Sequence, residues 1–287
     1  MRKKQRGEKQ RRETAKMESE EQSRVPQSSP EEGPEEGMPL ALKAEFRVLY
    51  EDDDIMVVDK AAPLLMHPTG KKQEPTLLHG LQALLVYELA CGGQVSLINR
   101  LDRETSGIVL VAKNAVAAGE LGKSMQQHHM RKTYQAIVLG CPAWDSAYCA
   151  EPILRMEEIA ATRVHVRQRC HPAGKPCQTA FRVLQRIPAR RHLPGMSLVE
   201  CTPETGRMHQ IRVHLAHLGY PIVGDKIYGG DERCYLEFIT TGWNESLAER
   251  LYLNRHALHA CRLEFPWRGR ILRIGSELPE DMAALLS

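Results

Sequence analysis

Short apolar stretches and amphipathic stretches alternate along this chain, and they predict a protein of mixed strands and helices. The apolar runs at 46–50 and 55–58 have the length of strands, and residues 132–140 begin with strict alternation of side chains. Apolar residues recur at helical spacing within 76–89 and within 115–129. At 287 residues, the chain can form one large domain or two small ones.

The composition is that of an ordinary soluble globular protein, with 42% hydrophobic residues. Its formal charge of +3 permits an anionic partner without requiring one. No apolar run is long enough to span a membrane, and no apolar segment follows the basic start as a secretory signal would require. The eight cysteines form no Cys-x-x-Cys pair, which is typical of reduced thiols in a cytoplasmic protein.

Residues 1–38 are predicted to be a disordered charged tail, and residues 39–287 to be the folded domain. The tail is basic up to Lys16, then acidic and proline-containing, and it has too few apolar residues to bury a core. Its basic part could hold a nucleic-acid backbone, or the two halves could partly neutralise each other in solvent. Both interpretations stay open.

The second half of the chain is predicted to add further strands and helices. Basic side chains occupy every second position from Arg163 to Arg169, so a strand there would place them on one sheet face. Such a face could hold an RNA backbone or simply face solvent. The expected strands are 159–168, 178–187, 196–201, 262–265 and 271–274, and the expected helices follow Gly206, follow Asn244 and cover 279–286.

The stretch from Asn99 to Gly107 connects two apolar runs and predicts a polar turn between strands. Asp102 stands in this turn between Arg100 and Arg103. A carboxylate on such a turn projects from a rigid scaffold, where functional groups concentrate. The alternative is a turn aspartate that bonds only its own backbone.

Three histidines lie in or beside the helix expected after Gly206. His209, His214 and His217 have spacings that could suit metal ligands, but the glutamate of a zinc-protease helix is absent. The spacing from Cys170 to Cys177 also differs from the common zinc sites. The sequence therefore predicts no metal site here, and a metal-dependent hydrolase is the weaker alternative.

The segment Arg-Leu-Asp-Arg-Glu-Thr-Ser-Gly at 100–107 resembles the catalytic motif of the RluA-type RNA pseudouridine synthases. The usual motif begins with histidine, and Asn99 takes that place here. Four further segments resemble other motifs of the same family, in the same order along the chain. They are residues 50–68, 132–140, 205–228 and 255–265.

The resemblance implies an α+β domain with a mixed, mostly antiparallel sheet, flanking helices and a central active-site cleft. It also implies isomerisation of uridine to pseudouridine in structured RNA, either ribosomal or transfer RNA, without a cofactor. We expect a monomer that acts in the cytoplasm and has no membrane partner. A catalytically inactive RNA-binding protein with the same fold is the alternative.

The resemblance also assigns roles to individual residues. Asp102 would act at the sugar as nucleophile or as base, and Arg212 would keep its carboxylate charged. Tyr134 would lie against the target base, although a tyrosine in a strand can also be mere packing. The residues expected to contact RNA are Arg100, which would fill the space left by the base, Arg103, Arg207, His209 and the pocket residue Ile211.

Overall fold

The computed structural model describes residues 44–69, 74–190, 193–231 and 233–287. The tail expected at residues 1–38 lies outside these ranges, so the division of the chain after residue 38 stays a prediction. In the described parts of the chain, no helix is both long and apolar enough to cross a membrane.

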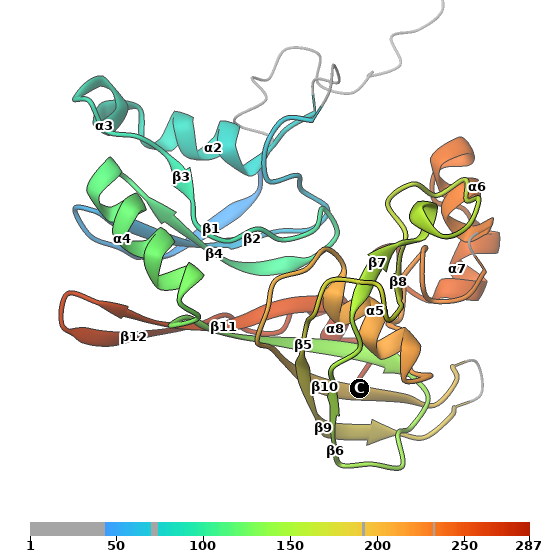
Figure 1. The fold of residues 1–287 in the computed structure, drawn as a ribbon. Coiled ribbons are helices and arrows are strands. Elements are labelled where there is room, and N and C mark those ends of the chain that lie inside the picture. The colour runs from blue at the N-terminus through green and yellow to red at the C-terminus, as the bar shows by residue number, and fades with distance from the viewer. Residues whose placement is uncertain (1–43, 70–73, 191–192, 232) are drawn as a thin grey trace, which may run out of the picture. The chain divides into compact units, whose positions relative to one another are not determined.

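A mixed ten-stranded sheet organises the described residues (Figure 1). The strands follow the order β1-β2-β4-β11-β5-β10-β9-β6, with β3 beside β4 and β12 beside β11. Among the described residues, the strand pairings of this sheet are antiparallel except for β4 with β11, which confirms the predicted α+β class with a mostly antiparallel sheet. The strands are β1 (Phe46–Glu51), β2 (Ile55–Lys60), β3 (Ser96–Leu97), β4 (Ser106–Ala112), β5 (Arg131–Leu139), β6 (Ser146–Cys149), β9 (Thr179–Ile187), β10 (Met196–Pro203), β11 (Leu258–Trp267) and β12 (Arg270–Gly275).

Strand β4 is the rigid element onto which the Asp102 turn leads. All seven of its residues are buried, as expected for an apolar run with neighbours on both sides. It pairs with β2 along six residues and with β11 at Ser106 and Gly107. The turn that carries Asp102 therefore ends in the interior of the sheet.

Helices cover the sheet, and polar caps begin several of them. Thr76 Oγ1 accepts from the His79 amide (3.2 Å), Asn114 Oδ1 from Ala117 (2.9 Å), and Asn244 Oδ1 from Leu247 (2.9 Å). The helices are α2 (Leu77–Leu84), α3 (Val86–Ala90), α4 (Ala115–Gln126), α5 (Gln210–His217), α6 (Arg233–Thr241), α7 (Glu245–Leu251) and α8 (Glu280–Ala283).

The single helix expected within 76–89 is divided into α2 and α3. Leu85 leaves helical geometry, with φ −98° and ψ 30°, while its side chain stays buried in the core. The next two side chains, Val86 and Tyr87, are exposed. Apolar spacing predicted helical structure but not the turn that keeps Leu85 inside.

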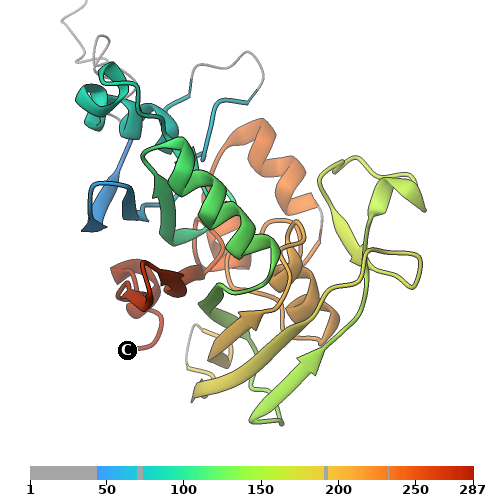
Figure 2. The ribbon, with the colours of Figure 1, turned by 60° about the vertical axis from the view of Figure 1, so that its left-hand side comes forward.

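The strand predicted at 159–168 is wrong. A short 3-10 helix (Met156–Glu158) and turns occupy this region, and only Gln168–Cys170 forms a strand, β8, which pairs with β7 (Ile153–Arg155). Val164 and Val166 alternate with the basic residues, but only Val164 is buried, and the segment turns where Thr162 Oγ1 accepts from the Val164 amide. The shared basic face is therefore not formed. Figure 2 shows this segment, in yellow-green, standing apart from the strands of the large sheet.

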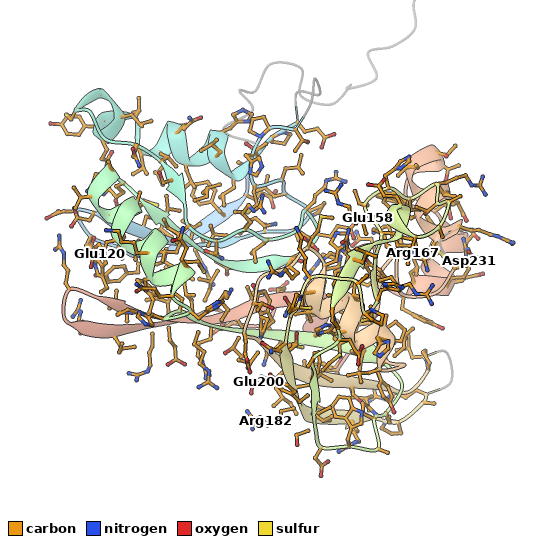
Figure 3. The ribbon with its side chains drawn as sticks, viewed as in Figure 1. Glu120, Glu158, Arg167, Arg182, Glu200 and Asp231 are labelled. Atoms are coloured by element: carbon orange, nitrogen blue, oxygen red, sulfur yellow. The ribbon has the colours of Figure 1, made fainter. Side chains whose placement is uncertain are left out.

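The arginines of β9 are paired on the outer face of the sheet. Arg182 donates twice to Glu200 on β10, at 3.1 and 2.9 Å, and both residues are labelled in Figure 3. Arg186 donates to Asp145 at 2.7 Å. These pairs neutralise the local charge and favour the solvent-facing interpretation of this part of the sheet.

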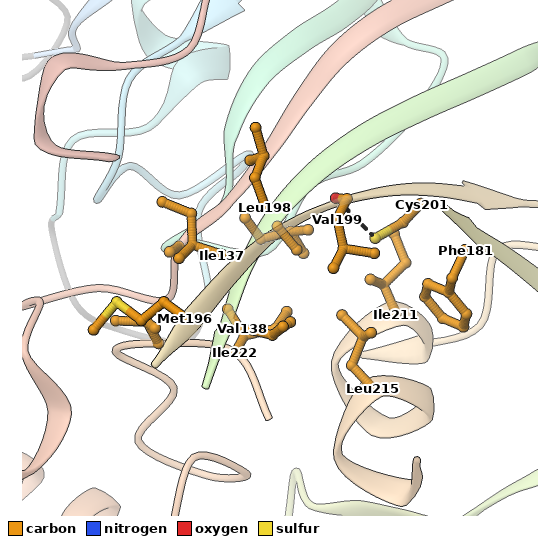
Figure 4. Packing of buried hydrophobic residues seen from close by; sticks show 14 of the residues in the cluster. Ile137, Val138, Phe181, Met196, Leu198, Val199, Cys201, Ile211, Leu215 and Ile222 are labelled. Carbon is orange, nitrogen blue, oxygen red and sulfur yellow. Dashed lines mark hydrogen bonds between the residues drawn. The ribbon is translucent and has the colours of Figure 1, made fainter. Parts of the chain in front are cut away.

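Packing fixes α5 against the sheet (Figure 4). Ile211 and Leu215 of α5 belong to one buried cluster with Phe181 of β9 and Cys201 of β10. The residues on the other side of α5 are therefore available to line a site.

An additional helix, α6, forms before α7, where the sequence predicted only the helix that follows Asn244. Cys234 of α6 is buried with Leu247 and Leu251 of α7, and Phe238 packs against them. The four-residue spacing from Cys234 to Phe238 was the helical signal that was missed.

Candidate active site

A cleft of about 560 Å³ opens where the Asp102 turn, β5 and the start of α5 meet. Its charged side chains comprise five cations and one carboxylate, Asp102. All eight residues proposed from the sequence line it, so the fold brings together segments that lie far apart in the chain. The cations are Arg100, Arg103, Lys132, Arg207 and Arg212.

Arg212 on α5 holds Asp102 and a second carboxylate together. Its Nη1 donates to Asp102 Oδ2 at 2.9 Å. Its Nε and Nη2 donate to the two oxygens of Asp225 at 2.7 and 2.9 Å. The Asp225 side chain is fully buried, whereas 31% of the Asp102 side chain is exposed toward the cleft. The two-point pair with Asp225 orients the guanidinium that Asp102 then meets.

The charges in this network favour an ionised Asp102. Burial by itself raises the pKa of the Asp102 carboxyl, but the Arg212 charge, with smaller effects from His209 and His256, holds that pKa below its ordinary value. Burial acts on the pKa of Asp225 in the same direction, and Arg212 again outweighs it. Asp102 is therefore a charged carboxylate at neutral pH.

Tyr134 of β5 places a neutral phenol in the same cleft. Burial raises its pKa well above the ordinary value, and the charge of Asp102 adds to this effect. Its side chain is half-buried and packs against two of the core clusters. The ring is thus held by packing while one part of it faces the space beside Asp102.

His209 is a neutral side chain of the cleft wall. Its Nδ1 lies 2.9 Å from the Tyr228 hydroxyl, and its Nε2 lies 3.8 Å from Asp102 Oδ2. Burial, with the Arg212 charge, lowers the pKa of His209 to about 4. At neutral pH it is therefore uncharged, and its approach to Asp102 is not an ion pair.

The remaining arginines from the sequence analysis lie at the edge of the cleft. Arg100, Arg103 and Arg207 are exposed, and each lines the cleft. Arg207 Nε donates to the carbonyl of Pro176 at 3.3 Å. These side chains give the opening a positive charge suited to a polyanion.

Asn99, which stands where the resembled motif has histidine, forms hydrogen bonds with the backbone of β4. Its Nδ2 donates to the carbonyl of Ile108 at 3.0 Å, and its Oδ1 accepts from the amide of Leu110 at 2.8 Å. The side chain therefore bonds to the backbone of β4 at two points. This anchors the segment just before Asp102.

Buried polar contacts also fix the end of the Asp102 turn. Glu104 accepts from Lys226 Nζ at 2.7 Å, and Thr105 Oγ1 lies 2.7 Å from His256 Nε2. Lys60 Nζ donates to the carbonyl of Arg103 at 3.2 Å. The turn is held on both sides of Asp102, so the carboxylate has little freedom to move.

His214 of α5, one of the three histidines whose spacing could suit a metal, has other partners. His214 Nε2 donates to the carbonyl of Glu151 at 2.9 Å, and its Nδ1 lies 2.9 Å from Thr179 Oγ1. Among the residues that the structure describes, no group of three or more histidine, cysteine or acidic side chains is placed to hold a metal ion.

Sequence reasoning missed the residues that support the site from behind. Asp225 and Tyr228 belonged to a recognised motif, yet neither received a role. Lys226, Lys60 and His256 also lie within the recognised motifs, and none of them received a role. A buried charge beside Arg212 cannot be deduced from spacing, because Asp225 lies 13 positions further along the chain and only the fold brings the two together.

Fold and cleft together define a protein that presents a charged carboxylate, a phenol and a positive rim in one cleft. Residues 54–217 match the profile of the family described as RNA pseudouridylate synthase. The chain belongs to this family.

Two bacterial relatives carry the name ribosomal large subunit pseudouridine synthase D. The Nitrosomonas europaea protein is 39% identical over 246 residues, which cover 84% of this chain and 64% of the relative. The Pseudomonas aeruginosa protein is 36% identical over 251 residues, which cover 86% of this chain and 73% of the relative. The chain thus spans about two thirds to three quarters of these relatives.

Two solved human structures have a similar fold. Human RNA Pseudouridylate Synthase Domain Containing 4 is 25% identical, with a TM-score of 0.63 over 83% of this chain and 91% of that structure. Human RNA Pseudouridylate Synthase Domain Containing 1 is also 25% identical, with a TM-score of 0.62 over 82% and 84%.

Proposed function

We propose that this chain isomerises uridine to pseudouridine in RNA, with Asp102 as the group that acts at the sugar. The observation that carries the proposal is the contact between Arg212 Nη1 and Asp102 Oδ2 in a cleft whose other charged side chains are cations. A carboxylate used as nucleophile or as base must be ionised, and this arginine keeps it so.

The reaction breaks the bond between the sugar and a ring nitrogen and forms a bond from the same sugar carbon to a ring carbon. No electrons or phosphate groups are transferred, so the groups required are those of the cleft. Asp102 acts at the sugar, Tyr134 stacks on the base, and Arg212 holds Asp102 charged. Ile211 contributes an apolar wall, and the uridine must leave its helix to reach this depth.

The RNA substrate that we propose is ribosomal RNA of the large subunit. The names of the bacterial relatives support this choice over transfer RNA. Arg100, Arg103 and Arg207 supply the cations that would follow the RNA backbone, and Arg100 would fill the space that the base leaves. We further propose that the enzyme is a monomer and that it acts in the cytoplasm, where ribosomal RNA is found.

Release of tritium tests the activity. Pseudouridine formation frees the hydrogen on carbon five of uracil, because the new bond to the sugar forms there. RNA from cells that lack the gene, labelled with tritium at that carbon, should release label to water in the presence of a strong chelator. An inactive binding protein releases none, and a metal-dependent hydrolase stops when its metal is removed. Either result would refute the proposal.

Asp102→Asn is the matched variant for this assay. Arg212 keeps its two bonds to Asp225, so the substitution leaves no isolated buried charge. We expect tritium release to disappear while RNA affinity and the unfolding midpoint stay nearly unchanged. Turnover by this variant, once deamidation back to aspartate has been excluded by mass spectrometry, would rule out Asp102 as the reacting group.

A further inference from the structure

Lys132 is a cation of the cleft for which neither the motifs nor the network around Asp102 gives a role. It lies on β5 two residues before Tyr134, so the two side chains share one face of the strand. Both line the cleft. Two residues of a strand span about 7 Å, which places the ammonium within one nucleotide of a base on Tyr134.

The Lys132 ammonium has no counter-ion among the described residues. Two other cations of the cleft differ, because Arg212 bonds to two aspartates and Arg103 lies 4.0 Å from Glu74. Burial alone lowers the pKa of Lys132, and no nearby acidic group opposes that effect. Half-burying a charge without a partner is costly, so such a position is stabilised when an anion enters the cleft.

The Lys132 ammonium lies beside Gly206 in the lining of the cleft. Gly206, before α5, lies across from it, and a methyl group in place of the glycine hydrogen would be 3.8 Å from Nζ. Gly206 is exposed. A ligand group that enters between Tyr134 and Gly206 can therefore reach Nζ.

We propose that Lys132 binds a backbone phosphate of the RNA, next to the nucleotide whose base lies on Tyr134. This inference depends on the proposed function, because it takes the RNA strand as the occupant of the cleft. A lysine suits the task because its ammonium meets phosphate as a compact point charge from several directions. The contact sets the position of the strand and carries no sequence information.

Charge removal at Lys132 is the first test, with Arg131 as the matched control. Arg131 is the adjacent residue, is exposed, and alternates to the other face of β5, so Arg131→Met removes the same charge outside the cleft. Lys132→Met should raise the KM for RNA about tenfold with kcat nearly unchanged, while Lys132→Arg and Arg131→Met stay near the wild type. The slope of log affinity against log salt should fall by about one in Lys132→Met only.

Uncharged phosphate analogues identify the contact itself. RNA oligonucleotides that each contain one methylphosphonate near the target uridine should bind wild-type protein about tenfold more weakly at one position. At that position Lys132→Met should lose no further affinity, whereas Arg131→Met should lose as much as the wild type. Equal additional losses in Lys132→Met at every position would overturn the proposal.

Failure of the proposed function gives a different result. If the wild type releases no tritium, the isomerase assignment fails, but fluorescence anisotropy with the same oligonucleotides still reports the phosphate contact. A Lys132→Met protein that binds charged and uncharged RNA like the wild type refutes the lysine site while leaving the isomerase activity intact.

Discussion

At the scale of single residues, the Arg212 guanidinium is the charge on which the cleft depends. It serves Asp102 on its open side and Asp225 on its buried side. Asp225 also accepts from the amides of Ile227 and Tyr228, at 3.0 and 3.1 Å, so its orientation is fixed by the backbone. The chain thus uses one fully buried carboxylate to hold the arginine that keeps another carboxylate charged.

Loss of Asp225 should destabilise the protein. Asp225→Asn removes one charge of a buried pair, and we expect the free energy of unfolding in urea to fall by about 3–5 kcal/mol at neutral pH. The control is Asp145→Asn, because Asp145 pairs with Arg186 at the surface with 91% of its side chain exposed. Equal stability of the two variants would show that the buried pair contributes nothing.

The pH dependence of stability should follow from the same residue. The pKa of Asp225 is lowered in the folded state, so its contribution is present above its ordinary pKa of about 4 and is lost as pH falls through the folded-state pKa. The free energy of unfolding of the wild type, measured in urea, should decrease as the pH falls below about 4. Asp225→Asn should show a shallower dependence, and an unchanged slope would contradict this reasoning.

The rate of isomerisation should depend more on the aromatic ring of Tyr134 than on its hydroxyl. The raised pKa keeps the phenol neutral, and stacking on a base requires only the aromatic face. Single-turnover tritium release should therefore fall further in Tyr134→Leu than in Tyr134→Phe. Full rates in both variants would mean that Tyr134 only packs the core.

At the scale of elements, Lys226 connects the segment that contains α6 and α7 to the Asp102 turn. Lys226 Nζ lies 4.5 Å from the centroid of the Phe238 ring and 5.6 Å from that of Trp243. It donates to Glu104, two residues after Asp102, and to the carbonyl of Asn254 at 2.6 Å. The rings of Phe238 and Trp243 thus hold the Lys226 ammonium, and this ammonium holds Glu104 in the turn.

We expect Lys226→Met to reduce the rate constant of isomerisation more than RNA affinity. Without the ammonium, Glu104 loses its partner and the turn loosens, and a small displacement of Asp102 can lower kcat by roughly 10- to 100-fold. Lys226→Arg should restore part of the rate. Arg250→Met is the control, because Arg250 of α7 pairs with Glu237 of α6. A raised KM with normal kcat in Lys226→Met would instead place Lys226 in RNA binding.

At the scale of the whole molecule, residues 1–38 contain too few apolar residues to bury a core. Deletion of residues 1–38 should therefore leave turnover of saturating RNA unchanged. If the basic arm holds RNA, affinity should fall and the salt dependence of binding should become shallower. Loss of cooperative unfolding in the truncated protein would show that the tail belongs to the fold.

The sequence by itself predicted most of the elements and singled out candidate residues for the site. Apolar alternation located β5, capping residues located the starts of α2 and α7, and local motifs singled out Asp102, Tyr134 and Arg212. These signals lie within a few residues of one another, so they can be read without the fold. At 159–168, where basic residues alternate with valines, the predicted strand was wrong, because the segment turns at Thr162 and leaves Val166 exposed.

Only the tertiary structure decided which charges meet. Contacts between separate elements place Asp225 behind Arg212 and place Lys226 between two aromatic rings and Glu104. They also leave Lys132 without a counter-ion among the described residues. The energy of a charge depends on burial and on neighbours in space, and neither follows from position along the chain. The sequence therefore determined which residues could react, and the fold decided which of them is charged, held and accessible.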